Sequence, residues 1–471
     1  MSIAPGFLRL SGLSDDEQVD LRGLLDRLAI FRSRNAVKDA YYEAEQHVRH
    51  MGIAIPPEVA NRIRPVVGWA STVVDVPEER LDWYGWSEVD GDLGLADVYA
   101  DNALDVESGP GHLDALLYGT SFVRVGSGAD GEPTPLVTVH SPNTTTGRWD
   151  PRARRLTAAV TVTAVKDGLA SEVVLDVVGV TITAQRAGGS WAVVDRDEHG
   201  LDRVPVARMA NRPRASRSEG KSEITKAVRY YCDAAVRTVL GMEGNREFYG
   251  IPQLTLLGRG PDAFIDASGN PTSGWRIVAG HALAIDKDED GDVPEIKQLQ
   301  VGSPQPFLEQ IKGWAQLLAT EAGLPVTYLG FQSDNPASAD AIRAMEARLV
   351  KRAERRQVGF GRTWLEVARL ALLVRDGEVP PDFYQRVSNR WRDAATPTRS
   401  AAADETTKYI AAGVLPPDST VTYDRMGLNP AEQRQLAADK RRQAGRGVLE
   451  ALRDRAGTPP APVPVTDGNA G

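Results

Sequence analysis

Three aspartates at alternate positions have the residue type and spacing of a calcium-binding loop. Asp286, Asp288 and Asp290, followed by Gly291, match the first half of an EF-hand loop, in which alternate oxygen ligands surround the ion and the glycine allows a sharp turn. The twelfth position of that loop requires a glutamate that binds through both oxygens, but Lys297 stands there. We therefore predict an acidic hairpin tip, with a cation site as the alternative.

A second candidate is the sequence Gly220-Lys221-Ser222, which resembles the end of a phosphate-binding loop. That loop needs another glycine five positions before the Gly-Lys pair, and Ala215 stands there. No strand-like run precedes the segment directly. We therefore reject nucleotide binding and predict a loop in which Ser222 caps the following helix.

The remaining residues of catalytic type form no recognisable centre. Ser121 lacks the second glycine of a nucleophile elbow, because Val123 stands at that position. The histidines form no His-Glu-x-x-His pattern and none has a cysteine at zinc spacing; they are His47, His50, His112, His140, His199 and His281. We predict no catalytic residue, no metal and no cofactor.

Composition narrows the classes of protein further. The chain has 471 residues, of which 42% are hydrophobic and 25% charged, and these values are ordinary for a globular protein. The formal charge of −9 argues against a broad basic face that grips phosphates. Cys232 is the single cysteine, so we predict no disulfide and a buried thiol. No apolar run approaches the length of a membrane helix, and the first residues do not form a signal peptide.

A polar loop lies between two long helical patterns near the middle of the chain. Phe307 to Ala322 has apolar residues at steps of three and four, and Gly323 with Pro325 ends that helix. Gly330 to Pro336 is a polar loop, and Ser338 then caps a helix that runs to Arg375.

We predict that this last helix presents two different edges. The apolar edge is Ile342, Met345, Leu349, Ala353, Phe360 and Trp364, and the polar edge is Arg348, Arg352, Arg355 and Arg362. The basic run 351–356 is predicted to be a solvated face, or to pair with acids of a neighbouring subunit. Gly359 and Gly361 predict a kink.

The other elements predict an α+β fold. Helices are expected at Asp15 to Met51, Val59 to Val74, Leu93 to Asp105, Gly111 to Tyr118, Ser222 to Glu247, Ala401 to Ala412 and Pro430 to Arg455. Alternating β-branched runs predict an antiparallel meander of strands at Ser121 to Val125, Leu136 to His140, Leu156 to Val165, Glu172 to Ala184 and Trp191 to Asp195, with a short aromatic strand at Arg80 to Trp86. We expect Ser222 to Glu247 to pair with Phe307 to Ala322.

Several short motifs in this order resemble one family. They are Asn211-Arg-Pro-Arg214, Gly220-Lys-Ser-Glu-Ile224, Pro325-Val-Thr-Tyr-Leu-Gly330, Asn335-Pro-Ala-Ser-Ala-Asp-Ala-Ile-Arg343, Trp391-Arg-Asp393 and Ala412-Gly-Val-Leu-Pro416. Together they resemble the portal proteins of tailed bacteriophages, specifically the Gp6-like family of siphophages, over about residues 20 to 450.

The resemblance implies a portal fold with an α/β wing, a two-helix stem, a β-containing clip, a long kinked helix and a helical crown. The implied parts are N-terminal helices and wing 1–220, first stem helix 221–250, clip 251–303, second stem helix 304–323, tunnel loop region 324–337, long helix and following segment 338–400, crown 401–456 and disordered tail 457–471.

The same resemblance implies roles for named residues. Phe331, Gln332, Ser333, Asp334 and Asn335 would face DNA as the tunnel loop. Lys312 and Gln316 would lie on the channel wall. The residues assigned to adaptor binding in the clip are Asp286, Asp288, Asp290 and Asp292.

We therefore predict a non-enzymatic homo-oligomeric ring, a dodecamer, that is assembled in the host cytoplasm and becomes part of the virion. DNA would pass through it without sequence-specific binding. The implied partners are the terminase large subunit, a head-completion or adaptor protein, and the major capsid and scaffold proteins; no membrane is implied. The alternatives are an intracellular metal-dependent hydrolase or nuclease, and another capsid or scaffold component.

Overall fold

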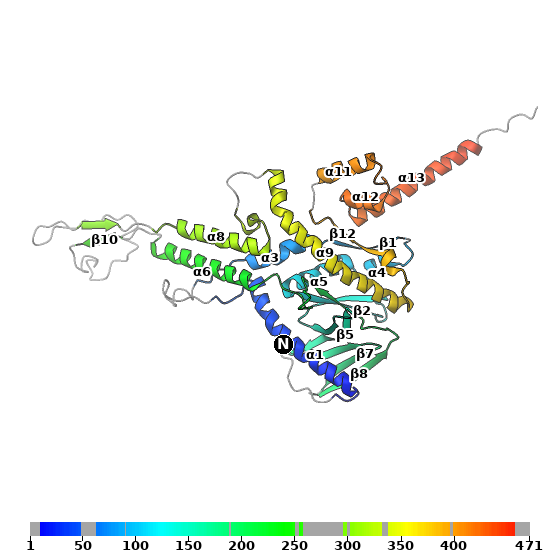
Figure 1. Ribbon diagram of the computed structural model, residues 1–471, viewed down its shortest axis with the longest axis horizontal. Coiled ribbons are helices and arrows are strands. Elements are labelled where there is room, and N and C mark those ends of the chain that lie inside the picture. The colour runs from blue at the N-terminus through cyan, green and yellow to red at the C-terminus, as the bar shows by residue number, and fades with distance from the viewer. Residues whose placement is uncertain are drawn as a thin grey trace, which may run out of the picture. The chain divides into compact units, whose positions relative to one another are not determined.

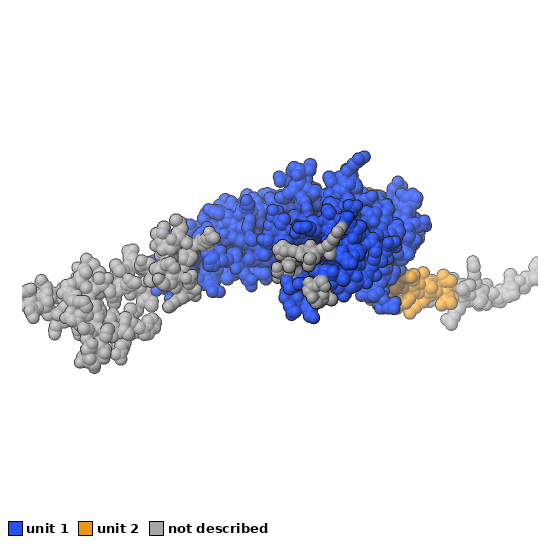
Figure 2. All heavy atoms as spheres, turned by 90° about the horizontal axis from the view of Figure 1, so that it is seen from below, with its two compact units in different colours: residues 1–390 blue, residues 391–471 orange. Residues whose placement is uncertain are grey.

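The computed structural model describes residues 10–48, 63–89, 91–187, 190–249, 254–257, 295–298, 302–331, 338–395 and 399–456. The chain divides into two compact units, residues 1–390 and 391–471, which Figure 2 colours separately. Helices and antiparallel sheets occur together, which confirms the predicted α+β class. No helix within the described ranges is both long and apolar enough to span a bilayer.

A five-stranded antiparallel sheet confirms the later part of the predicted meander, whereas the predicted strands Ser121 to Val125 and Leu136 to His140 lie in a separate three-stranded sheet. The five strands pair antiparallel in chain order: β4 (Thr145–Asp150), β5 (Arg155–Lys166), β6 (Leu169–Val177), β7 (Val180–Ala187) and β8 (Ser190–Glu198). Helix α1 (Asp15–Tyr42), capped by Ser14, lays four buried leucines on this sheet. The single strand predicted from Glu172 to Ala184 was wrong, because Gly179, with φ of +81°, turns the chain between β6 and β7.

A second sheet has the order β3-β2-β9, with β2 at Thr120–Gly126, β3 at Leu136–His140 and β9 at Val206–Ala210. It contacts α5 (Leu104–Tyr118) and the long helix α9 (Ala339–Asp376). Ser338 caps α9 as predicted, since its Oγ accepts a hydrogen bond from the Ala341 amide at 3.2 Å. The helix continues without a break through Gly359 and Gly361. Figure 1 shows its ribbon changing direction, and a kink at those glycines stays a prediction.

Five further elements lie around an aromatic core. They are α3 (Trp69–Glu78), β1 (Trp83–Glu88), α4 (Leu95–Asp101), α10 (Phe383–Arg386) and β12 (Val387–Trp391), which pairs with β1. Trp364 of α9 is fully buried and stacks on Trp83 with ring centroids 4.1 Å apart. A helix was predicted from residue 59, but residues 63–67 are not helical, because Pro65 cannot donate to a helical ladder.

Helices α6 (Lys226–Tyr249) and α8 (Gln305–Ala322) lie side by side, as Figure 1 shows, and this confirms the predicted partnership. Asn245 Nδ2 donates to the Gly302 carbonyl at 3.1 Å at one end of the pair. Trp314 Nε1 donates to Thr238 Oγ1 at 3.2 Å in the middle. The later residue of α6 contacts the earlier residue of the α8 region, and the earlier residue of α6 contacts the later one. The two helices are therefore antiparallel. Strands β10 (Leu254–Leu257) and β11 (Glu295–Gln298) pair between them in sequence.

The second unit is helical, as predicted. It contains α11 (Arg399–Ala411), α12 (Thr420–Arg425) and α13 (Pro430–Ala456). Asn429 and Glu432 exchange hydrogen bonds of 2.8 Å at the start of α13 and form a capping box. Few of its side chains are buried, and Val448 and Leu449 are exposed.

Candidate functional site

The segment that leads into α6 is held by backbone hydrogen bonds to the end of α5 and the turn after it. The Glu223 amide donates to the Leu116 carbonyl at 2.9 Å, and the Asn211 amide donates to the Gly119 carbonyl at 2.9 Å. A Cβ on Gly220 would lie 1.6 Å from the Gly119 oxygen, so only glycine can occupy position 220. The Gly-Lys-Ser sequence therefore packs against backbone and encloses no phosphate-sized loop.

The predicted capping role of Ser222 was wrong. Its hydroxyl donates to the Leu117 carbonyl at 2.5 Å and accepts from the Ile224 amide at 3.0 Å, and Ser222 lies four residues before α6 begins. Thr225 caps α6 instead, because its Oγ1 accepts from the Val228 amide at 3.2 Å. The hydroxyl of Ser222 is used to fasten the segment to α5.

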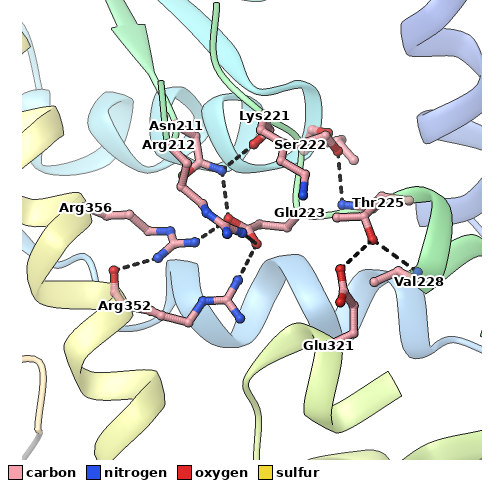
Figure 3. Close-up of polar contacts among 12 residues, drawn as sticks. Asn211, Arg212, Lys221, Ser222, Glu223, Thr225, Val228, Glu321, Arg352 and Arg356 are labelled. Carbon is pink, nitrogen blue, oxygen red and sulfur yellow. Dashed lines mark hydrogen bonds and ion pairs between the residues drawn. The ribbon is translucent and has the colours of Figure 1, made fainter. Parts of the chain in front are cut away.

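A buried carboxylate stands at the centre of this segment, and Figure 3 shows the side chains that converge on it. Glu223 is 2% exposed. Its Oε2 accepts from Arg352 Nη2 at 2.6 Å, and its Oε1 accepts from Asn211 Nδ2 at 2.8 Å and from Arg356. Arg212 approaches Oε2 at 3.5 Å. We call these five residues the charged junction.

The electrostatics of the charged junction favour the ionised carboxylate. Burial raises the pKa of the Glu223 carboxyl, but the charges of Arg356 and Arg352 and the hydrogen bond from Asn211 outweigh burial, and the pKa lies below its ordinary value. Burial lowers the pKa of Arg352 to about 10, which leaves it cationic at neutral pH. The junction is thus an ionised cluster that joins α9 to the start of α6.

The end of α8 is tied to the same part of α9. Arg348 Nη1 donates to the Thr320 carbonyl at 2.9 Å. After α8, the short helix η2 (Val326–Leu329) places the Tyr328 hydroxyl 2.9 Å from Glu346 Oε1, to which it donates. Phe331 is half-buried and sets its ring edge against Trp69, with centroids 6.4 Å apart. Both sides of the segment 332–337 are therefore anchored to folded helices.

The structure describes some of the predicted site residues. Lys312 and Gln316 are exposed on α8. Each lies two residues from Trp314, about 200° round the helix from the side chain that contacts α6. Gln332, Ser333, Asp334 and Asn335 lie outside the described residues, and so do Asp286, Asp288, Asp290 and Asp292.

The basic run of α9 is the predicted solvated face only at Lys351 and Arg355, which are exposed. Arg352 and Arg356 are 15% and 4% exposed in their side chains and bind Glu223 of the same subunit. The signal was present in the sequence, because Arg356 continues the spacing of the buried residues Leu349, Ala353 and Phe360. The prediction of the apolar edge was wrong for its first two residues, which are not buried. Ile342 and Met345 are 46% and 45% exposed.

Within the described ranges, no group of three or more His, Cys, Asp or Glu residues could hold a metal ion. Cys232 is buried, as predicted, and burial raises the pKa of its thiol to about 12, which makes it a poor nucleophile. His112 is buried against Trp364, whose Nε1 lies 2.9 Å from His112 Nε2. These groups contribute to the packed core, and the arrangement around Glu223 is suited to holding helices in place.

Comparison with known proteins identifies the family. Residues 24–445 match the family model described as phage portal protein, SPP1 Gp6-like. The chain belongs to this portal protein family. A portal protein forms the ring-shaped channel through which phage DNA is packaged into the capsid and ejected from it, and it is a structural component of the virion. This membership confirms the predicted family and replaces the hydrolase and scaffold alternatives.

The sequences of two relatives align with nearly the whole length of this portal protein. The portal protein of Mycobacterium phage L5 is 32% identical over 460 residues, which cover 93% of this chain and 93% of that relative. The portal protein of Mycobacterium phage D29 is 32% identical over 423 residues, which cover 87% and 85%.

Two solved structures also resemble the chain. One is from the virion of a native gene transfer agent particle, with a TM-score of 0.37 and 15% identity over 83% of this chain and 99% of that one. The other is from the neck of that particle, computed with C12 symmetry, with a TM-score of 0.40 and 14% identity over 77% and 90%.

Proposed function

We propose that twelve copies of this portal protein form the ring at one capsid vertex, with α8 as the channel wall. The observation that supports this proposal is the outward face of α8. Gln305, Glu309, Lys312, Gln316 and Thr320 recur at steps of three and four, and all are exposed. The face carries one acid and one base, so it is nearly neutral. Such a wall lets a duplex slide, since strong binding to phosphates needs clustered cations.

In this proposal α6 and α8 form the stem, residues 251–303 the clip and residues 401–456 the crown. Residues 331–335 form the tunnel loop, in which residues 332–335 face DNA and Phe331 is the anchor packed against Trp69. Phe331 and Ser338 hold the loop at the narrowest part of the channel. The terminase large subunit and a head-completion or adaptor protein dock on the ring, the latter through Asp286, Asp288, Asp290 and Asp292. Capsid and scaffold proteins surround the ring.

Imaging of the purified chain by electron microscopy tests the assembly. We expect ring particles with an axial hole whose class averages have twelvefold symmetry, because head-to-tail contacts between identical subunits close a ring when the rotation between them allows it. Native mass spectrometry gives an independent subunit count. Rings with another count would contradict the dodecamer, and compact monomers at all concentrations would contradict self-assembly.

Deletion of residues 332–335, with the packed Phe331 retained, tests the tunnel loop. We expect an unchanged melting temperature and normal rings, because both anchors stay in place. Packaged DNA that survives nuclease treatment should fall by on the order of tenfold, since loops on a rigid scaffold carry function more than stability. A matched variant replaces the four residues by Gly-Ser-Gly-Ser and separates loop length from side-chain chemistry. Normal DNA retention in the deletion variant would contradict the assignment, and loss of folding would show that the loop is part of the core.

A further inference from the structure

A groove beside the charged junction gathers cations from two segments that are distant in sequence. It has a volume of about 770 Å³. Residues 210–221 line one side, α9 lines the other, and Glu321 of α8 also contributes to the lining. Besides Arg352 and Arg356 of the charged junction, the cations of its lining are Arg212, Arg214, Arg217, Lys221, Arg348, Lys351 and Arg355. We call it the basic groove. It concentrates positive charge on a chain whose formal charge is −9.

Part of this charge is not neutralised within the subunit. Lys351 pairs with Glu354 at 2.6 Å, and Arg212 reaches Glu223. Arg214, Arg217 and Arg355 are exposed, and no carboxylate in the described part of the chain lies within ion-pair distance of them. Three guanidinium groups in one groove repel each other, so the groove is complementary to an anionic partner.

Two glutamates that form no ion pair in the described part of the chain lie at the C-terminal end of α3. We call Glu78 and Glu79 the acidic edge. Burial raises the pKa of Glu78 to about 7, and the carboxylates of Asp82, Asp75 and Glu79 add to the shift. No cation within the described ranges forms an ion pair with Glu78 or Glu79. The acidic edge therefore presents the exposed carboxyl group of Glu79 with the half-buried Glu78 beside it, and neither has an ion-pair partner among the described residues.

We propose that the basic groove of one subunit binds the acidic edge of the adjacent copy in the ring. A ring closed by rotation joins two different surfaces of the same chain, and these two surfaces have opposite and uncompensated charge. The inference rests on the ring assembly proposed above. DNA is the other anionic partner to consider. Tight binding of DNA phosphates in the groove would oppose the sliding of DNA that the nearly neutral channel wall allows. We therefore favour the neighbouring copy as the occupant.

Two charge-reversal variants make the interface testable. The first, Arg214→Glu with Arg355→Glu, changes the summed charge of Arg214, Arg217 and Arg355 from +3 to −1, so that carboxylates of the groove meet the acidic edge. The second, Glu78→Lys with Glu79→Lys, gives a subunit in which both surfaces are basic. Each variant alone should lose rings, with the fraction of assembled subunits falling about tenfold or more at fixed concentration, because like charges then meet at every interface.

An equal mixture of the two variants should recover rings. Each reversed groove then meets a reversed edge, so both kinds of contact in an alternating ring are attractive. A fault in folding would not be repaired by mixing. Because Glu78 is half-buried, the exposed pair Arg214→Glu and Glu79→Lys serves as a second set. Arg152→Glu with Lys166→Glu, exposed cations of the turn between β4 and β5 and of β5, is the charge-matched control and should assemble normally.

Mass photometry and binding of a short DNA duplex are measured for each sample. Rings from either variant alone at the wild-type level, or no recovery in the mixture, would overturn the proposal. Loss of duplex binding in the first variant with intact rings would assign the groove to phosphates. A wild-type ring of an even number other than twelve would contradict the proposed dodecamer and leave the test of this interface valid, because the two variants can alternate only in an even ring.

Discussion

Replacing Glu223 with alanine is expected to lower the free energy of unfolding by about 3–5 kcal/mol, because removal of one partner leaves buried charges without a counter-ion. The charges are those of Arg352 and Arg356, whose side chains are 15% and 4% exposed. The change also removes one of the two acceptors of the Asn211 side-chain amide, which keeps the Lys221 carbonyl as the other. Urea unfolding followed by circular dichroism measures the effect.

Glu219 provides a matched control because it is also a glutamate of the segment before α6 and pairs with an arginine. Its 2.9 Å pair with Arg27 is about one third exposed on both sides. Glu219→Ala should therefore cost less than about 1 kcal/mol. A triple variant with Glu223→Leu, Arg352→Met and Arg356→Met should be more stable than Glu223→Ala, since it buries no unpaired charge. Equal costs for the two single alanine variants would contradict the structural role of the charged junction.

The lowered pKa of Glu223 also predicts that the stability of the fold depends on pH. The pKa of Glu223 is lowered in the folded chain from an ordinary value of 4.5, so its ionisation stabilises the fold above that value. The contribution is lost as the pH falls through the lowered pKa. The difference in stability between the wild-type chain and Glu223→Gln should therefore be constant near neutral pH and shrink in acid. A difference that grows in acid would contradict the sign of the shift.

Trp364→Ala is expected to cost about 3–5 kcal/mol, as large-to-small changes in a packed core do. Trp364 is fully buried, stacks on Trp83, and accepts at its backbone carbonyl from Trp86 Nε1 at 2.9 Å. The variant also removes the indole N–H that lies 2.9 Å from His112 Nε2. Burial lowers the pKa of His112 to about 3, so its ring is neutral and accepts this hydrogen bond.

Val358→Ala provides the control on the same helix, since Val358 is 77% exposed and should change stability by no more than about 0.5 kcal/mol. Trp364→Phe keeps most of the packed area but loses the donor. The cost of Trp364→Phe in unfolding free energy should lie between those of Val358→Ala and Trp364→Ala. A cost for Trp364→Ala near that of Val358→Ala, measured by thermal or urea unfolding, would show that α9 is not held by this core.

Elements with strong local signals were predictable from the sequence. Alternating β-branched residues and the glycines between them specify the antiparallel meander, and Ser338 specifies the start of α9. The pairing of α6 with α8 followed from their matching apolar spacing. The division of residues 172–184 into two strands was missed because Val177 to Val180 continues the β-branched run, and Gly179 alone turns it.

The charged junction could not be assembled from local patterns. Glu223 and Arg356 are 133 positions apart, and their contact depends on α9 lying beside the segment that follows β9. A single sequence shows only that Arg356 occupies an apolar stripe, which indicates a buried partner without naming it. The clash that requires Gly220 likewise depends on Gly119, which is remote in sequence.

The spacing of the arginines on α9 has a consequence for the register of this helix. Arg348, Arg352 and Arg356 stand four residues apart, so they repeat along one side at intervals of about 6 Å. A slide of α9 by one turn would offer Glu223 the pair Arg348 and Arg352 in place of Arg352 and Arg356. Ion pairing with Glu223 alone therefore does not distinguish between two positions of α9 along its own axis. The stack of Trp364 on Trp83 has no such repeat, and it selects one of them.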